Sequence, residues 1–466
     1  MRSPGFRPAR VAVLGLGITI VIGTLLLMLP VARTGAPMWA EGTLTAPAVA
    51  AGPSLPGGAP LSVAFFTATS ATSVTGLIVA DTATYWSTFG QVVIALLIEI
   101  GGVGTMTFAA LMAVYVAHRL RLRQRLVVAQ VTGALTMEDI RGFIRRIVRT
   151  AIVVQLIFAV PLVIDFYMRE GAIGKALGWG MFFSISAFNN AGFALTTNSL
   201  IPFATDPLII LPISVLIVIG GLGFPVLAEV FHVVRLRGKK HWHWSLGTRL
   251  VFVGTAGLII LGWILIALLE WNNLSASGEY SSGDKLLITL FSAISPRTAG
   301  FNSMDIASQS DVTWLLTDAL MFIGAGPAGT AGGVKITTML VLVFLVHTEL
   351  RAGKAVQLFG SRVGRSTQRT AITVLMIAFT ITAVSTAALM LLTPWGMEPL
   401  LLEVISAVST VGLSTGITPH LPIAAQLIVC VLMFFGRLGP ATVATVLAIR
   451  PDSKLYELPK ERLIIG

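Results

Sequence analysis

The sequence contains few charged residues. Only 11% of its 466 residues are Asp, Glu, Lys or Arg, whereas a soluble domain carries about 25%. Hydrophobic residues make up 55% of the chain, and the mean hydropathy is +0.87. This shortage of charge excludes an ordinary soluble protein and indicates that lipid is the solvent for most of the chain. The length allows many membrane spans of about 20 residues each.

The sequence also has little of the chemistry that enzymes use. Its single cysteine, Cys430, lies in the apolar run "LIVCVLMFF", so an internal disulfide is excluded and a buried helical residue is expected. No hydrolase triad, phosphate-binding loop or metal-ligand cluster is present, and "HWHW" at 241–244 is typical of aromatic anchoring at a membrane surface. We therefore expect neither an enzyme nor a covalently bound cofactor.

The basic residues are unevenly distributed. Of the 32 Lys and Arg residues, 25 lie in the first ten residues, in three long basic loops or in the C-terminal tail. The loops on the other side of the expected spans hold only Arg33, Arg169, Lys175, Lys285 and Arg297. Positive charge marks the cytoplasmic side of a membrane protein. We therefore expect a multi-pass plasma-membrane protein with both termini in the cytoplasm and no role in nucleic-acid binding.

Four segments of the sequence resemble one another. They are "SATSVTGL" (70–77), "SAFNNAGF" (186–193), "SAISPRTAGF" (292–301) and "SAVSTVGL" (406–413). Each begins with Ser-Ala and ends with a glycine followed by Leu or Phe, and the glycines are 116, 108 and 112 residues apart. Such regular spacing indicates a fourfold internal repeat.

Each segment has the same neighbours in the sequence. A long apolar span comes first, then a stretch of about a dozen apolar residues that is too short to cross a bilayer, then the segment and a second long span. The first spans are expected at Val11–Leu29, Ile147–Tyr167, Arg249–Leu269 and Ala371–Leu392. Because the chain returns to the cytoplasm after each repeat, the short stretch must enter the membrane and turn back. The expected fold is an all-α integral membrane protein with four helix–pore helix–filter–helix repeats around one central pore.

Irregular backbone at membrane depth is tolerated where it lines a cavity, and rings of backbone carbonyls can replace the hydration shell of K⁺. We predict repeats at 1–125, 126–244, 245–369 and 370–466, the last with the C-terminal tail, and filters at 73–77, 189–193, 297–301 and 409–413. The candidate filter residues, where K⁺ is the only metal expected, are Val74, Thr75, Gly76, Asn190, Ala191, Gly192, Thr298, Ala299, Gly300, Thr410, Val411 and Gly412. The alternative is that these glycines only allow helices to pack closely.

With these motifs the sequence resembles the Trk/Ktr/HKT superfamily of potassium transporters. "GRLGPAT" (436–442) and "ERLIIG" (461–466) look closer to the Ktr membrane subunit than to the Trk subunit. The resemblance implies a homodimer with one pore per subunit and a cytoplasmic, nucleotide-binding regulatory subunit as partner. Some plant relatives have serine at the first filter glycine and favour Na⁺, so Gly76 implies K⁺. The inserted Pro296 and Arg297 make the filter asymmetric.

The second span of every repeat carries a glycine cluster. "GGVG" from Gly101 and "GGLGFP" from Gly220 are expected to permit close helix packing. "IGAGPAGTAGGVK" at 323–335 is different, because Gly costs about 1 kcal/mol and Pro about 3 in a helix interior relative to Ala. It contains G-x-G-x-x-G, but its long apolar flanks disfavour a nucleotide-binding turn. We predict a broken helix, and the resemblance implies an intramembrane gating loop; the alternative is a static kink.

The candidate gate includes two cations. Its residues are Gly324, Gly326, Pro327, Gly329, Gly332, Gly333, Lys335 and Arg437. A cation beneath a cation filter adds a barrier to conduction, and intramembrane charges usually face a partner or a cavity. Glu99 is expected at a similar depth and is the candidate charge partner of Arg437; a purely structural salt bridge is the alternative. On the outer side, acidic residues such as Asp81 and Asp206 either attract cations or are merely solvated.

The sequence thus predicts potassium uptake through a four-repeat selectivity filter that is gated by an intramembrane loop. Three questions stay open. A proton- or sodium-coupled carrier is the first alternative, and proton coupling would require Glu99 and Asp318 to form a proton relay. A Trk-type rather than a Ktr-type subunit is the second alternative, and Na⁺ is retained as a candidate activating ion.

Overall fold

The computed structural model describes residues 7–35, 56–118, 137–235, 244–277, 280–351, 353 and 355–439. The basic stretches at 119–125 and 236–243, the first six residues and most of the C-terminal tail lie outside the described residues. The expected cytoplasmic position of both termini, and the predicted repeat boundary at 125/126, fall on these parts of the chain.

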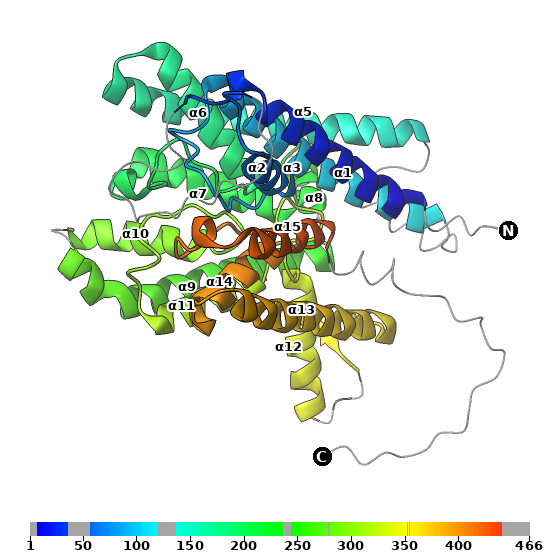
Figure 1. Cartoon of the computed structure of the whole chain (residues 1–466). Helices are drawn as coiled ribbons and strands as arrows, with labels where there is room; N and C mark the ends of the chain where they lie inside the picture. Colours follow the sequence, from blue (N-terminus) through cyan, green and yellow to red (C-terminus); the bar gives the residue numbers. More distant parts are fainter. Residues whose placement is uncertain are drawn as a thin grey trace.

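The described chain is helical apart from its loops and one small hairpin. The four long first helices are α1 (Arg7–Leu27), α5 (Met137–Glu170), α9 (Leu246–Ser277) and α13 (Arg365–Leu392). The four short helices that follow them are α2 (Leu61–Ser73), α6 (Ile173–Asn189), α10 (Ser282–Ile294) and α14 (Met397–Val408). Figure 1 shows α1, α5 and α13 beginning on the same side of the molecule. The expected first spans therefore lie in helices, except that α1 ends at Leu27, two residues before the expected end of the first span.

The helices that follow the short ones differ in length, and in two of the four sets the helix is broken in two. They are α3 (Thr88–His118), α7 (Pro207–Leu222) with α8 (Phe224–Arg235), α11 (Asp311–Phe322) with α12 (Ile336–Leu350), and α15 (Ile423–Leu438). Single turns of 3₁₀ helix lie at Pro30–Ala32, Ile201–Phe203 and Thr418–His420, and β1 (Gln357–Leu358) pairs antiparallel with β2 (Ser361–Arg362).

The four helix sets pack in a closed order. The second helix of each set lies against the short helix of the next, so that α3 contacts α6, α7 contacts α10, α11 contacts α14, and α15 contacts α2. The last of these contacts joins the end of the described chain to its beginning. Small buried residues of the short helices, such as Ala68 and Ala407, lie in the main hydrophobic core.

The lengths and surfaces of the helices fit a membrane. Within the described residues, four helices are long and apolar enough to span a bilayer, or five if a bent pair counts as one span. Large apolar side chains face outward along them; on α13, for example, Phe379, Val384 and Leu391 are exposed. An outward apolar surface of this kind is stable in lipid and unfavourable in water. The chain is an all-α, multi-pass membrane protein, as predicted.

The second helix of the second set differs from the expected straight span. It breaks at Gly223, where α7 and α8 meet at a bend of 102°. Gly223 has φ +89°, a conformation that glycine adopts without steric cost. The third set also has a broken helix, as predicted: α11 ends at Phe322 and α12 begins at Ile336. In Figure 1, α12 points away from the rest of the bundle, across the direction of α13.

Candidate ion filter and intramembrane segment

The four glycine segments meet in a closed ring. A Cβ atom added to Gly76 would lie 2.4 Å from the carbonyl oxygen of Ala191 and 3.1 Å from the Cα of Gly192. The same relationship runs from Gly192 to Gly300, from Gly300 to Gly412, and from Gly412 back to Gly76. Four backbone carbonyls, those of Thr75, Ala191, Ala299 and Val411, therefore crowd around four glycine Cα atoms. Only residues without a side chain fit at this level, because each neighbour is backbone.

The backbone of the segments repeats with the same period. The residue two positions before each glycine has a positive φ, from 50° at Thr410 to 75° at Thr298, with Val74 and Asn190 between them. The glycines themselves have φ between 71° and 96°. Positive φ at Val or Thr is strained and costs of order 1–3 kcal/mol, and such strain clusters at functional sites. The repetition in four segments far apart in the chain indicates a shared function.

Serine side chains hold the segments in place, and they do so in two ways. The hydroxyl oxygens of Ser70 and Ser406 accept from the backbone N–H of Gly76 and Gly412, at 3.1 and 3.0 Å. In the second segment, the hydroxyl of Ser186 instead donates to the carbonyl of Phe193 at 2.8 Å. These serines are the first residues of the sequence motif. Their hydrogen bonds to the glycine end of each segment explain why the motif begins with serine.

The third segment accommodates its two extra residues by using a different serine. The hydroxyl of Ser295, and not that of the motif's first serine Ser292, donates to the carbonyl of Phe301. Ser292 lies 3.0 Å from the hydroxyl of Ser303 instead. The inserted Arg297, which was counted among the residues of the outer loops, lies in the turn that follows α10. It is only 4% exposed, so it is not part of a solvent-exposed loop.

Glycines in the second helices bring these helices against the ends of the short ones. A Cβ on Gly101 would lie 2.0 Å from the carbonyl oxygen of Thr72, and one on Gly220 would lie 1.9 Å from that of Phe188. Gly436 has the same relationship to Val408, at 2.1 Å. The close packing predicted for the first two clusters is therefore present, and it supports the short helices immediately before the ring.

The segment 323–335 forms a closed loop that docks on neighbouring helices. Its two ends are joined, since Gly324 N donates to the Val334 carbonyl at 2.8 Å. Its middle contacts the break between α7 and α8: Gly326 N donates to Gly221 O at 2.8 Å, and Phe224 N donates to Ala328 O at 3.2 Å. The bend at Gly223 thus exposes backbone groups of α7 and α8 that bind the loop.

The same loop lies directly against the fourth segment of the ring. A Cβ on Gly332 would lie 2.2 Å from the hydroxyl oxygen of Thr410 and 2.6 Å from the carbonyl of Ser409. Gly333, with φ +69°, lies against the side chain of Ser409. The loop and the ring are in van der Waals contact, and no side chain could be added between them.

Of the two predicted cations, Lys335 is the last residue of this loop and Arg437 lies against it. Arg437 is 7% exposed; its Nη1 donates to the carbonyl of Thr330, and its Nη2 donates to the carbonyl of Gly101 at 2.7 Å. The Nζ of Lys335 donates to the carbonyls of Ala331 and Gly332. Arg437 therefore ties the loop to α15 and α3, whereas Lys335 bonds only within the loop.

The predicted pairing of Glu99 with Arg437 is wrong. Glu99 Oε2 accepts from Gln155 Nε2 at 2.8 Å and from Asn189 Nδ2 at 2.6 Å. Asn189 is the last residue of α6, immediately before the second segment of the ring. Because one carboxylate oxygen accepts from two amides, Glu99 joins α3 to α5 and to the end of α6. Sequence reasoning missed Gln155 and Asn189, since neutral amides give no charge signal in an apolar run.

A buried carboxylate of the fourth helix set was not predicted. Glu403 of α14 is fully buried and accepts from the hydroxyls of Ser414 and Thr418, the latter at 2.9 Å. It holds the chain that leaves the fourth segment. A glutamate inside the apolar run "PLLLEVIS" was the signal that could have found it.

The outer acidic residues are engaged in structural contacts. Asp81 is 1% exposed and accepts from the hydroxyl of Thr197 at 2.7 Å, which ties the first helix set to the second. Asp206 caps α7 and pairs with Arg169. Of the two alternatives, the merely solvated carboxylate is therefore wrong for Asp81.

The fold and the ring define the class of protein: a multi-pass membrane protein built around four converging segments. The family described as "TrkH: Cation transport protein" matches residues 41–458. "Ktr system potassium uptake protein B" of Bacillus subtilis (strain 168) is 36% identical over 437 residues, which cover 94% of this chain and 92% of that protein. The protein of the same name from Vibrio alginolyticus is 35% identical, over 88% of this chain and 89% of its own length.

A third relative and one solved structure extend the comparison. "Potassium/sodium uptake protein NtpJ" of Enterococcus hirae is 34% identical and covers 86% of this chain and 89% of that protein. The crystal structure of the potassium transporter TrkH from Vibrio parahaemolyticus has the same fold, with a TM-score of 0.70 at 18% identity over 95% of this chain and 85% of that one. The chain belongs to the TrkH family of cation transport proteins. It is a transporter and not an enzyme, and the predicted Trk/Ktr resemblance is confirmed.

Proposed function

We propose that this chain is the membrane subunit of a potassium uptake system. The observation that carries the proposal is the closed ring of Gly76, Gly192, Gly300 and Gly412 with four backbone carbonyls around it. Carbonyl oxygens replace the hydration shell of K⁺ at such a ring, and strained backbone holds them in place before the ion arrives. The residues assigned to the filter are the twelve predicted from the sequence, three from each segment. The names of two relatives, which refer to potassium uptake, support K⁺ as the ion.

The loop 323–335 is the proposed gate. Its direct contact with Ser409 and Thr410 supports a position beneath the ring, in the path of an ion that has passed the filter. Arg437 holds the docked loop through the Thr330 carbonyl, and Lys335 closes the end of the loop on itself, so that two positive charges lie beside that path. Undocking the loop from Gly221 and Phe224 would remove the obstruction and leave the ring in place.

A cytoplasmic, nucleotide-binding regulatory subunit is the proposed controller of this gate, and a homodimer in the plasma membrane with both termini in the cytoplasm is the proposed assembly. Two relatives are named as protein B of a Ktr system, which supports a further component. The repeat boundaries are proposed to be those predicted from the sequence. The subunit is proposed to be of the Ktr type and not of the Trk type.

One observation favours a second function. A relative of 34% identity is named a potassium/sodium uptake protein, so Na⁺ is either a second transported ion or an activator. A proton-coupled carrier receives less support, because Glu99 is bonded to Gln155 and Asn189 and is not placed in a chain with Asp318.

The decisive experiment is K⁺ uptake in cells that lack their own uptake systems. We expect this chain, expressed with a Ktr-type regulatory subunit, to restore growth and ⁸⁶Rb⁺ uptake at low K⁺. The measurement is made with and without Na⁺, and with and without a proton gradient. Uptake that vanishes with the proton gradient would favour the carrier, and the absence of uptake from a well-expressed protein would exclude the proposal.

A further inference from the structure

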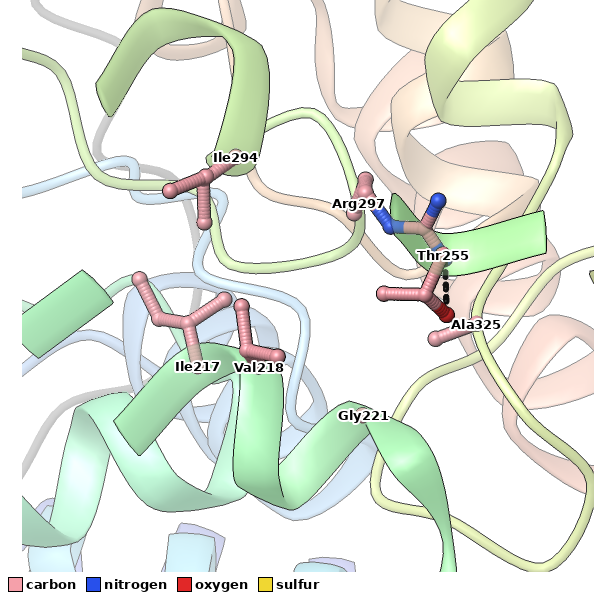
Figure 2. A pocket seen from close by; sticks show the side chains of 7 residues that line it. All are labelled: Ile217, Val218, Gly221, Thr255, Ile294, Arg297 and Ala325. Atoms are coloured by element: carbon pink, nitrogen blue, oxygen red, sulfur yellow. Dashed lines mark hydrogen bonds between the residues drawn. The ribbon is translucent and has the colours of Figure 1, made fainter. Parts of the chain in front are cut away.

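A large groove lies between α3, α5 and α6. Its volume is about 1100 Å³, which matches the upper end of the range for pockets that hold drug-sized ligands. The cavity beside Arg297 is far smaller: Figure 2 shows it between Ile217, Ile294 and Ala325, and its volume of about 10 Å³ is room for one water molecule. Of these two hollows, only the groove has room for an organic molecule.

Glycines keep the groove open. A Cβ atom added to Gly174 or Gly178 of α6, or to Gly104 of α3, would meet no atom within 4 Å. Most of the remaining wall is apolar and includes Leu96 and Ile152, which are both exposed. Exposed apolar side chains on the helices of a membrane protein face lipid. The groove therefore opens toward the hydrocarbon of the bilayer.

One carboxylate lies in the wall of this groove. Glu99 is partly exposed there, and its Oε2 accepts from both Gln155 and Asn189. Its Oε1 accepts no hydrogen bond from the described residues and is not enclosed by protein. Glu99 is 11 residues beyond Thr88, where α3 begins, which is about 16 Å along the helix. At this depth Oε1 is level with the hydrocarbon and not with the lipid headgroups.

The charge of Glu99 is not balanced inside the groove. Among the described residues that line it, the only Lys or Arg is Lys175, whose Nζ binds Glu170 at 2.5 Å and lies 4.8 Å from the centre of the Trp179 ring. The ion pairs of the described part of the chain do not include Glu99. A carboxylate at membrane depth is costly unless it is paired. A cation with an apolar body would compensate this charge.

An amphiphilic amine fits these features better than a lipid acyl chain or water does. An acyl chain fills the groove and leaves Glu99 Oε1 facing hydrocarbon, while water that binds Oε1 meets mostly apolar walls. An alkylammonium ion donates an N–H to Oε1 and lays its chain along the groove, and a charge-assisted hydrogen bond is about twice as strong as a neutral one. The alkyl chain gains little over its place in the bilayer, so the charge decides which amphiphile binds.

We propose that this groove is a binding site for hydrophobic amines, with the ammonium group on Glu99 Oε1. None of the described residues that line the groove belongs to the twelve filter residues or to the loop 323–335. The site thus goes beyond the proposed function, and its occupancy can be measured without transport. Because Glu99 Oε2 binds Asn189, the last residue before the second filter segment, a bound amine lies next to a support of the ring.

Binding of tritiated dodecylamine to the full chain in phosphatidylcholine nanodiscs provides the test. A primary amine is protonated at pH 7, and dodecanol has the same alkyl chain without the charge. We expect saturable binding above that of empty nanodiscs, displaced by unlabelled dodecylamine and not by an equal concentration of dodecanol. Binding that does not saturate, or equal displacement by dodecanol, would overturn the proposal.

Two variants locate the site and one controls for charge. Glu99→Gln keeps the shape of the side chain and removes its charge, so the affinity for dodecylamine should fall about tenfold. Gly178→Leu places a side chain in the groove and should weaken binding without changing the carboxylate. Asp318→Asn removes a buried carboxylate on α11, outside the groove, and should leave binding unchanged.

The Tm of each variant shows whether it is folded. If Glu99→Gln does not fold, Gly178→Leu decides the matter. Wild-type affinity in a folded Glu99→Gln or Gly178→Leu variant, or a loss of affinity in Asp318→Asn equal to that in Glu99→Gln, would contradict an amine site at Glu99.

Discussion

Arg437 of α15 donates from Nη2 to the carbonyl oxygen of Gly101 in α3, at 2.7 Å. The two residues lie 336 positions apart in the chain. Through its other amino group, Arg437 also holds Thr330 of the loop 323–335. One side chain of the last helix thus connects the loop to the first helix set. A planar guanidinium has several N–H donors, so it can bind two acceptors that lie in different directions.

Replacing Arg437 should release the loop. Arg437→Gln removes a charged hydrogen bond to Thr330, and bonds of this kind contribute about 1.5–3 kcal/mol each. We expect K⁺ flux per folded protein to rise about tenfold in liposomes without a regulatory subunit. Arg437→Lys is the matched control, because it keeps the charge and loses the two-armed geometry. Low flux in Arg437→Lys together with high flux in Arg437→Gln would mean that charge, and not docking, limits conduction.

Shortening the loop is a second test of the gate. Deleting Ala328–Ala331 removes Thr330 and the carbonyl that Phe224 binds, while the bond from Gly324 to Val334 still joins the two ends. We expect ⁸⁶Rb⁺ flux in liposomes to rise severalfold, because an obstruction is removed and the filter is untouched. Thr330→Ala keeps the loop length and should change flux little. Equal or lower flux from a properly folded deletion variant would leave the glycines as packing residues.

Gly76→Ser tests the ring. The added Cβ would lie 2.4 Å from the Ala191 carbonyl oxygen, and φ is +96° at this position, so the ring must distort. We expect the K⁺/Na⁺ uptake ratio to fall about tenfold, which corresponds to ~1.4 kcal/mol of lost discrimination. Gly104→Ser, in the same helix set, meets no atom within 4 Å and should behave as wild type. An unchanged ratio in well-expressed Gly76→Ser would remove Gly76 from the filter.

Glu99 should couple to Asn189 and not to Arg437. Glu99→Ala leaves the amides of Gln155 and Asn189 without their acceptor and should cost about 1–3 kcal/mol of stability. Combined with Asn189→Ala, it should show a coupling energy of about 0.5–3 kcal/mol in a double-mutant cycle of unfolding in detergent. The corresponding cycle with Arg437→Gln should give nearly additive effects. A strong coupling to Arg437 would restore the charge pair that the sequence suggested.

Membrane orientation is tested with single cysteines. In a Cys430→Ala background, Ser282→Cys at the start of α10 should react with an impermeant thiol reagent added outside intact cells. Ser366→Cys at the start of α13 should react only after the membrane is permeabilised. Both positions are exposed, so accessibility within the protein does not distinguish them. Labelling of Ser366→Cys from outside would reverse the proposed topology.

Much of the architecture follows from local sequence signals. Scarce charge and long apolar runs determine that lipid is the solvent, and four Ser-Ala…Gly segments at nearly equal spacing predict four short helices and four turns. The cost of five glycines and a proline in ten residues predicts the break between Phe322 and Ile336. These signals are reliable because composition and motif spacing can be read along the chain without knowing which distant residues touch.

The pairing of side chains was decided only by the tertiary structure. The sequence placed Glu99 and Arg437 at a similar depth, but depth does not specify the direction in which a side chain points. Close packing of Gly102 against Asn189 gave Glu99 a nearby amide, and the loop and α3 each gave Arg437 one carbonyl. The inward turn of Arg297 likewise depends on where α10 ends and what α7 and α9 leave open behind it. Contacts between distant segments are fixed by the packing of the whole ring, and this information is not present in any single stretch of the sequence.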